Sequence, residues 1–360
     1  MRREFPEAVL VVSVTTRTGM ELAAERLEGI VNHLLYSPFD LPPVVSRFIG
    51  RLQPDLFILV ETDFWPNWLL GLRQKQIPSL LVNGRISQAS FRRYQRLAWF
   101  FRPMFQSFTR LSLQSASDRS RCLELGIAAD AIRILGNLKY DTGLPDNRRV
   151  APSREKTGLD HQARIWLCGS THRGEEETLL RVALELKSEI PDLVLVLAPR
   201  DVNRREELVR LAQKLGCKPV LRSRWLQEPG NRDRIDMLLL LDTIGELAGW
   251  YQLADLAFIG GSLVPEGGHN PLEAATCSVP VLFGPHMDDF TDIAAEMLAC
   301  GGARTVHSGE EMLGLARDIL NRPDQHQAMQ RAQQQLIAKH SEVTTRHIEE
   351  IKALLHQSGS

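Results

Sequence analysis

Short runs of consecutive apolar residues alternate with amphipathic stretches along the whole 360-residue chain. Most runs are apolar throughout rather than alternating, which is typical of strands that helices cover on both faces. The predicted strands are residues 8–14, 56–60, 79–83, 110–113, 165–168, 193–198, 237–241, 256–259 and 279–283. Strands that alternate with helices predict parallel sheets in an α/β fold.

A polar segment divides this pattern in two. Residues 143–163 contain two prolines and lack the periodicity of a helix or a strand, so we interpret them as a linker. Residues 1–142 then form a first Rossmann-like domain, and residues 164–360 form a second one that includes the terminal helices. Since a domain has about 150 residues, the length fits two domains, which we expect to face a cleft.

The first residues of the chain resemble the end of a helix. Residues 4–11, Glu-Phe-Pro-Glu-Ala-Val-Leu-Val, repeat the pattern of residues 189–196, Glu-Ile-Pro-Asp-Leu-Val-Leu-Val. In the second half a strand, a Gly-Ser-Thr loop and a helix precede this pattern, and nothing precedes it in the first half. We therefore expect the first domain to lack its opening strand and helix; the alternative is that it starts differently.

Composition narrows the class of protein. The chain has 43 Lys and Arg residues against 44 Asp and Glu, so net charge favours neither nucleic acid nor an acidic tail. The five cysteines have no paired spacing, which favours a reducing compartment over disulfides or a zinc site. The ten histidines form no close pair along the chain, and we expect no metal. No apolar run approaches the roughly 20 residues of a membrane helix, and the first residues do not predict a signal peptide.

The loop after one predicted strand has the chemistry of a nucleotide site. Residues 260–262 are Gly-Gly-Ser, and a helix is predicted with Asn270 at its N-cap and Pro271 at its first position. Backbone N–H groups at a helix start bind phosphate, and glycines allow a ligand to approach. Glu273 has a carboxylate for both ribose hydroxyls. The alternative is a capping box of Asn270 and Glu273, and the glycines favour the nucleotide.

Three more strands of the second half end in polar loops. Residues 242–246 are Asp-Thr-Ile-Gly-Glu, for which a capping box of Thr243 and Glu246 is an equally good interpretation. Residues 169–175, Gly-Ser-Thr-His-Arg-Gly-Glu, are a second anion-binding turn, and Arg200 follows another strand. Because ligands bind at the carboxyl ends of parallel strands, the four loops together predict a nucleotide site.

In the first half, Glu61 and Asp63 follow a predicted strand and point the same way if the backbone stays extended. Paired carboxylates act as a base or stabilise positive charge, although solvated surface acids are the common alternative. The next strand ends in residues 83–87, Asn-Gly-Arg-Ile-Ser. Residues 136–141, Gly-Asn-Leu-Lys-Tyr-Asp, contain Lys139, which can meet an anion.

Residues 85–117 contain no Asp or Glu and combine arginines with aromatic residues. This composition suits an anionic membrane surface or a phosphorylated lipid, and single-stranded nucleic acid fits it too. The alternative is an amphipathic helix with an arginine face. The residues concerned are Arg85, Arg92, Arg93, Arg96, Arg102, Arg110, Tyr94, Trp99, Phe100, Phe101, Phe105 and Phe108.

These motifs, in this order and spacing, resemble the 3-deoxy-D-manno-octulosonic acid (Kdo) transferases over essentially the whole chain. The matching segments are 61–67, 83–87, 136–141, 242–247 and 260–273. The resemblance implies a GT-B glycosyltransferase fold and an inverting, metal-independent transfer of Kdo from CMP-Kdo to the lipid A precursor, lipid IVA, in lipopolysaccharide synthesis. It also implies no cofactor, no nucleic-acid partner, and a place on the cytoplasmic face of the Gram-negative inner membrane.

The resemblance also assigns roles to residues. Glu61 and Lys139 match the family's stabilisers of the transition state, and Arg85, Ser170 and Thr171 are candidates for the acceptor or another anion. The family's general-base Glu and its hydrophobic anchor belong upstream of the first residue, in agreement with the missing opening strand. The residues expected to hold CMP are Pro199, Arg200, Ile244, Gly245, Glu246, Asn270, Pro271, Leu272 and Glu273.

Two other functions fit part of the pattern. A UDP-sugar epimerase can share the two-domain architecture, and it should prefer UDP over CMP and need no lipid. A non-catalytic module could instead bind anionic lipid or nucleic acid through residues 92–110, and it should have no affinity for nucleotides.

Overall fold

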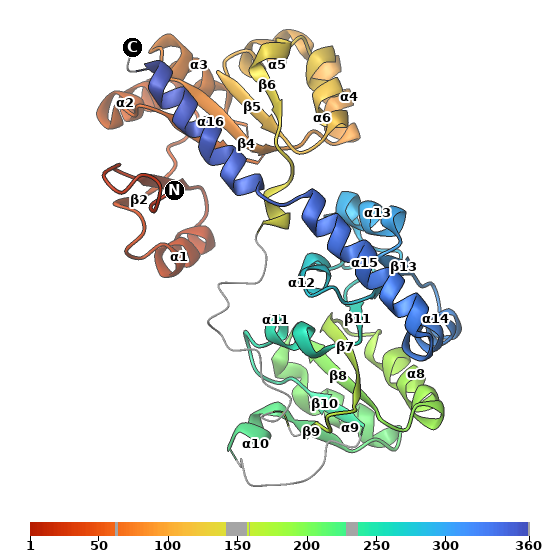
Figure 1. The fold of residues 1–360 in the computed structure, drawn as a ribbon. Coiled ribbons are helices and arrows are strands. Elements are labelled where there is room, and N and C mark those ends of the chain that lie inside the picture. Colours follow the sequence, from red (N-terminus) through yellow and green to blue (C-terminus); the bar gives the residue numbers. More distant parts are fainter. Residues whose placement is uncertain (62–63, 142–156, 158, 228–236, 359–360) are drawn as a thin grey trace. The chain divides into compact units, whose positions relative to one another are not determined.

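The structure is a computed structural model that describes residues 1–61, 64–141, 157, 159–227 and 237–358. The chain forms two compact units, Met1–Asp141 with Glu342–Ser360, and Thr142–Ser341. Both units are built from parallel strands and helices (Figure 1), which confirms the predicted α/β class. Most of the predicted linker, residues 143–163, lies outside the described residues.

The second unit contains a seven-stranded parallel sheet in the order β13-β12-β11-β7-β8-β10-β9. Its described helices are α8 to α15, and their bounds are given below. Strands β9 and β13 were not predicted, because each is short and has few apolar residues. The strands are β7 (Arg164–Thr171), β8 (Leu193–Pro199), β9 (Pro219–Leu221), β10 (Leu238–Leu240), β11 (Leu256–Ile259), β12 (Val281–Phe283) and β13 (Ala303–Thr305).

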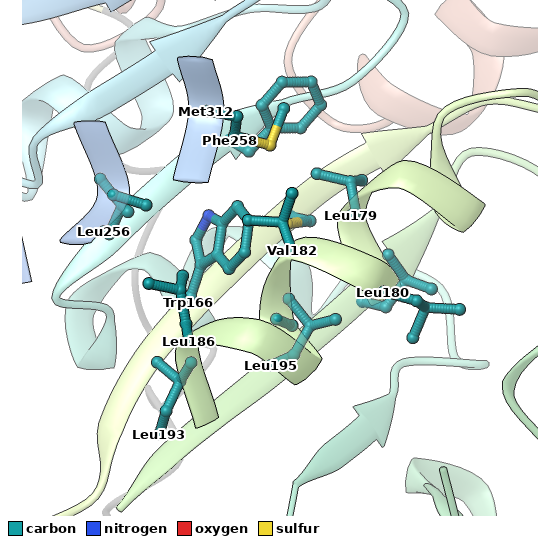
Figure 2. Packing of buried hydrophobic residues seen from close by; sticks show 14 of the residues in the cluster. Trp166, Leu179, Leu180, Val182, Leu186, Leu193, Leu195, Leu256, Phe258 and Met312 are labelled. Carbon is teal, nitrogen blue, oxygen red and sulfur yellow. The ribbon is translucent and has the colours of Figure 1, made fainter. Parts of the chain in front are cut away.

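The core of the second unit surrounds the middle of this sheet. Every residue of β8 is buried, and Trp166 of β7 is fully buried against apolar side chains of α8 and α14 (Figure 2). The helices are α8 (Glu176–Glu189), α9 (Arg205–Lys214), α10 (Arg222–Gln227), α11 (Leu247–Trp250), α12 (Leu272–Thr276), α13 (Thr291–Cys300), α14 (Gly309–Asn321) and α15 (Pro323–Lys339), with short 3-10 turns η3 (Val202–Arg204), η4 (Tyr251–Leu253) and η5 (Asp288–Phe290).

The first unit contains a four-stranded parallel sheet in the order β3-β4-β5-β6, and β1 pairs with β2 in a separate two-stranded sheet. Strands β2 and β6 were not predicted. The strands are β1 (Val11–Val14), β2 (His33–Tyr36), β3 (Phe57–Val60), β4 (Ser79–Gly84), β5 (Arg110–Leu113) and β6 (Ile132–Ile134). The helices are α1 (Arg17–Arg26), α2 (Pro42–Leu52), α3 (Pro66–Gln74), α4 (Gln88–Arg96), α5 (Ala98–Phe105) and α6 (Ala116–Glu124), with turns η1 (Ala129–Ala131) and η2 (Leu138–Tyr140).

The last helix corrects the predicted domain boundary. We expected all terminal helices in the second domain, but α16 (Val343–Ser358) belongs to the first unit. Its residues Ile348, Ile351 and Leu354 pack against Leu80 and Val82 of β4. These three residues lie three apart on one helical face, so the chain returns to cover a sheet face that would otherwise be exposed.

Candidate functional site

The order of strands in the second sheet reverses at β7, which is the topological switch point of the sheet. From β7 the chain proceeds to β8 on one side, and it later returns to β11 on the other side of β7. In open α/β sheets this switch point is where ligands bind, at the carboxyl ends of the strands. The loops that follow β7 and β11 therefore form the middle of the candidate site.

A buried carboxylate joins these two loops. Glu175 is 0% exposed, and its Oε2 accepts hydrogen bonds from the backbone N–H groups of His172 (2.8 Å) and Gly261 (2.8 Å). Its Oε1 accepts from the N–H groups of Ser262 (3.0 Å) and Leu263 (2.9 Å). Four N–H donors satisfy the charge that burial would otherwise make costly. Glu175 thus holds the loop after β11 against the loop after β7.

This network changes the expected role of the glycine-rich loop. The prediction used its backbone N–H groups for phosphate, but those of Gly261, Ser262 and Leu263 bind Glu175. Sequence analysis included Glu175 only as part of a turn. Acidic residues are common at the start of a helix, where they interact favourably with the helix dipole. The sequence therefore does not distinguish Glu175 from an ordinary acidic residue at a helix start.

Gly260 is required by close packing of the same two loops. A Cβ at this position would lie 2.2 Å from the carbonyl oxygen of Ser170 and 2.6 Å from the Cα of Thr171. The Gly260 N–H donates to the carbonyl of Gly169 at 2.8 Å. The glycine therefore allows two backbones to touch, which differs from the predicted approach of a ligand.

Two histidines meet at this edge, although they lie 97 residues apart. The Nε2 atoms of His172 and His269 are 2.8 Å apart, and the ring planes differ by 21°. The prediction that the histidines form no close pair therefore holds along the chain and is wrong in space. Burial lowers the pKa of His269, and the charges of His172 and Arg200 lower it further.

Arg200, the first residue after β8, is exposed. Its backbone N–H donates to the carbonyl of Thr171 at 3.0 Å, which ties it to the loop after β7. Ser170 has a left-handed backbone with φ +55°. The buried Thr171 Oγ1 has no hydrogen-bond partner among the described residues. Arg200, Ser170 and Thr171 are thus gathered at one sheet edge.

The predicted nucleotide helix starts one residue later than expected. Helix α12 begins at Leu272 with Pro271 at its N-cap. The Oδ1 of Asn270 accepts from the N–H of Leu272 at 3.1 Å. Glu273 is partly buried, and burial raises the pKa of its carboxyl. The buried Tyr251 lies close enough that the charge of Glu273 helps burial raise its pKa.

The loop after β10 is held by a second carboxylate. The Oε2 of Glu246 accepts from Thr243 Oγ1 (2.9 Å) and from Arg222 Nε (3.0 Å). The Arg222 guanidinium also lies 5.6 Å from the ring centroid of Trp250, a cation–π distance. Between Thr243 and Glu246, Gly245 has φ +85° and Ile244 is 85% exposed.

The first unit gathers its candidate residues differently. Glu61 follows β3 with φ +65°, and its N–H donates to the carbonyl of Val82 at 2.9 Å. Asn83, with φ +58°, accepts from the N–H of Leu138 through its Oδ1 at 3.0 Å. This bond fastens η2, which contains Lys139, to the end of β4. Arg85 lies just beyond β4 and is half-buried. Asp63 lies outside the described residues.

The arginine and aromatic stretch has two faces. Phe91, Tyr94, Phe105 and Phe108 are buried in the core of the first unit. By contrast, Leu97 is 43%, Trp99 78% and Phe100 44% exposed. The exposed arginines nearby are Arg92, Arg93, Arg96 and Arg102. We name Leu97, Trp99 and Phe100 the aromatic corner.

Some classes of site are not seen among the described residues. No group of three or more His, Cys, Asp or Glu side chains there is arranged to hold a metal ion. Within the same ranges, no helix is both long and apolar enough to cross a bilayer.

The fold resembles those of an epimerase and a glycosyltransferase of known structure. A crystal structure of UDP-N-acetylglucosamine 2-epimerase matches with a TM-score of 0.62 and 14% identity over 99% of this chain and 91% of that chain. A glycosyltransferase from Rickettsia africae matches with a TM-score of 0.56 and 15% identity over 96% of this chain and 97% of that chain. With two Rossmann-like units, the chain has the predicted GT-B fold of glycosyltransferases and these epimerases. At these identities the likenesses establish the fold alone.

Sequence comparisons decide between those classes. Residues 1–142 match the family model described as 3-deoxy-D-manno-octulosonic-acid transferase (kdotransferase). The 3-deoxy-D-manno-octulosonic acid transferase of Haemophilus influenzae is 30% identical over 99% of this chain and 83% of its own length. The transferase of that name from Bordetella pertussis is 31% identical over 95% of this chain and 80% of its own. The chain belongs to the Kdo transferase family and is a glycosyltransferase, which confirms the predicted resemblance.

Proposed function

We propose that this Kdo transferase moves Kdo from CMP-Kdo to the lipid A precursor, lipid IVA, with inversion and without a metal ion. The observation that carries the donor part is the polar edge at the switch point of the second sheet. There the loop after β7, Arg200, the loop held by Glu246 and the start of α12 all follow strands of one parallel sheet.

In this proposal each loop contacts one part of CMP. Arg200 pairs with the phosphate, and Glu273 accepts hydrogen bonds from the ribose hydroxyls. Glu246 is kept in place by Arg222 and Thr243, so that Ile244 and Gly245 present backbone and an exposed apolar side chain to the nucleoside. The remaining contacts assigned to CMP are Pro199, Asn270, Pro271 and Leu272.

The proposed chemistry uses groups of the first unit. Lys139 meets the negative charge of departing CMP, and Glu61 steadies positive charge on the sugar. Preorganised charges of this kind are each worth about 10²–10³ in rate. A lysine supplies the charge that a divalent cation would otherwise supply, which supports transfer without a metal. Arg85, Ser170 and Thr171 are assigned to anionic groups of the substrates.

Calorimetric titration of the chain with CMP, with UDP as the comparison, tests the donor assignment. We expect CMP to bind more tightly than UDP. Glu273→Ala should weaken CMP binding by about 1.5–3 kcal/mol, the contribution of a hydrogen bond to a charged group. Glu310→Ala, at an exposed position in the first turn of α14, is the matched control and should leave affinity unchanged. A preference for UDP would instead favour the epimerase activity.

The acceptor part of the proposal places the chain on the cytoplasmic face of the Gram-negative inner membrane, where the lipopolysaccharide precursor lies. The aromatic corner exposes two rings beside Arg92, Arg93 and Arg96. Aromatic and basic side chains together suit the headgroup region of an anionic bilayer. We assign this surface to lipid rather than nucleic acid because the proposed acceptor is a lipid, and no acidic residue lies between Arg85 and Ser117 to repel its anionic groups.

Co-sedimentation with phosphatidylglycerol-containing vesicles tests the membrane part. Binding should fall strongly in Trp99→Ala and in the double variant Arg92→Glu, Arg93→Glu. Phe39→Ala is the control, since Phe39 is 84% exposed but outside the aromatic corner. Binding of a single-stranded oligonucleotide in place of vesicles would contradict the assignment.

A further inference from the structure

The Glu175 network raises the question of what binds an anion at the switch point. Three backbone N–H groups of the glycine-rich loop already bind Glu175, and that of Gly268 donates to the carbonyl of Gly261 at 2.9 Å. These four backbone donors of the loop are therefore occupied. An anionic ligand at this edge can gain a full positive charge only from side chains.

The His172–His269 pair is placed to meet it. The two rings lie over Gly261, since a Cβ there would come within 3.3 Å of His269 Cδ2 and 3.4 Å of His172 Cδ2. His172 follows β7 and His269 precedes Asn270, so the pair joins the two loops assigned to the donor. The charge of Arg200 acts on His269 from the end of β8.

The hydrogen bond between the rings restricts the charge of the pair. At 2.8 Å, one Nε2 must carry a proton and the other must accept it. The accepting imidazole is then neutral, while the donor is neutral or charged according to its Nδ1. The pair therefore holds a charge of zero or one, and a second added proton would break the bond.

The surroundings set the balance between these two states. The groups that face His269 are His172 from the β7 loop, Arg200 from the β8 end, Asp289 from η5 and Glu266 from its own loop. Burial and the two basic groups oppose a charge on His269, and Asp289 and Glu266 favour it. An anion bound beside Arg200 would offset the Arg200 charge and so favour protonation of the pair.

We propose that the His172–His269 pair is an anion-binding element of the donor site that takes up a proton from solvent when the phosphate or the carboxylate of the donor binds. The inference rests on the proposed function and adds a regulation by pH to it. Uptake of a proton on binding requires affinity to rise as pH falls. The pair thereby supplies positive charge only when the donor is present.

Calorimetry of the full chain in buffers of different ionisation enthalpy measures the proton uptake. CMP tests the phosphate, free Kdo tests the carboxylate, and cytidine lacks both. We expect CMP binding to the original chain near pH 7 to take up more protons than binding to His269→Gln or His172→Gln. The histidine NMR measurement described below separates proton uptake by the pair from proton uptake by the CMP phosphate. His307→Gln, at an exposed histidine paired with Glu311, should behave as the original chain.

The outcomes separate the inference from the proposed function. CMP binding with equal proton uptake in all variants would overturn the His172–His269 assignment and leave the donor site intact. Uptake with Kdo but not with CMP would assign the pair to the carboxylate. Absence of CMP binding to the original chain would overturn both. Nitrogen NMR of the original chain with 15N-labelled histidine needs no variant. The imidazole signals of the pair should show that it gains a proton when CMP is added. Unchanged imidazole signals would contradict the inference.

Discussion

The carboxyl edges of the two parallel sheets rely on a buried carboxylate to different extents. In the second unit a buried carboxylate, Glu175, satisfies four N–H groups and holds two loops together. In the first unit the corresponding positions, Glu61 and Asn83, have left-handed backbone, and a neutral amide bond to Leu138 fastens the neighbouring turn. The first edge also has a buried carboxylate, Asp118, but it accepts from one backbone N–H of a neighbouring loop, that of Ile86 (2.9 Å), whereas Glu175 accepts from four.

The difference follows from what each edge is proposed to do. A donor site needs loops in fixed positions, which a fully hydrogen-bonded carboxylate supplies. A residue in the left-handed region costs about 1–2 kcal/mol when it is not glycine, and such positions concentrate where a side chain must point in a particular direction. Glu61 is the candidate for such a direction here.

The largest effect should come from removing the carboxylate of the second unit. Glu175→Ala leaves four N–H groups without their acceptor and should lower the free energy of unfolding of that unit by about 4 kcal/mol. Hydrogen exchange combined with denaturant, which reports each unit separately, is the measurement. Glu177→Ala on the same helix removes an exposed pair with Arg181 and should change stability by less than about 0.5 kcal/mol. Equal effects of the two variants would refute the comparison.

A steric version of the same test uses Gly260. Gly260→Ala forces a Cβ against the Ser170 carbonyl and should cost about 3 kcal/mol in the free energy of unfolding. Gly314→Ala is the matched control, because Gly314 lies inside α14 with no atom within 4 Å of its Cβ position. There the alanine should stabilise by about 0.5–1 kcal/mol. The two Gly→Ala changes should therefore shift the midpoint temperature of thermal unfolding in opposite directions.

Asn83 tests the amide bond and the backbone of the first unit separately. Asn83→Ala loses the bond to Leu138 and keeps an unfavourable left-handed residue, so we expect a loss of about 2 kcal/mol. Asn83→Gly loses the bond alone and should cost about 1 kcal/mol. Both variants should increase hydrogen exchange around Lys139. If exchange there stays unchanged, Asn83 does not hold that turn.

Glu61 tests whether backbone strain accompanies the proposed catalytic role. Glu61→Gly should be more stable than Glu61→Ala by about 1 kcal/mol, because glycine adopts φ +65° without the Cβ penalty. The rate of Kdo transfer, measured as release of CMP from CMP-Kdo, should fall by the same factor in both variants. Higher stability of the alanine variant would argue against strain at this position.

The last prediction concerns pH and applies to both units. Burial lowers the pKa of His269 in the second unit and of the buried His347 in the first. The unfolded chain then binds more protons than the folded chain below about pH 6.5, so stability falls as pH drops below that value. Denaturant unfolding between pH 5 and pH 7.5 measures it. His347→Gln should flatten the slope of the first unit only, and His269→Gln that of the second.

Much of the fold was predictable because its signals are local. The apolar runs identified β1, β3, β4, β5, β7, β8, β10, β11 and β12. Most of these are buried strands of parallel sheets, which need apolar side chains on both faces. The strands that were missed, β2, β6, β9 and β13, are short, and all four lie at sheet edges. The domain to which α16 belongs was not predictable, because an amphipathic helix does not specify which sheet it covers.

The sequence by itself determined the class of fold, the family and the positions at strand ends where its motifs lie, because these depend on local periodicity and on residue order. Only the tertiary structure decided what those loops do. It assigned three glycine-loop N–H groups to Glu175 rather than to a ligand, and it brought His172 to His269 across 97 residues. Hydrogen bonds between distant loops depend on the order of strands in the sheet, which no local pattern encodes.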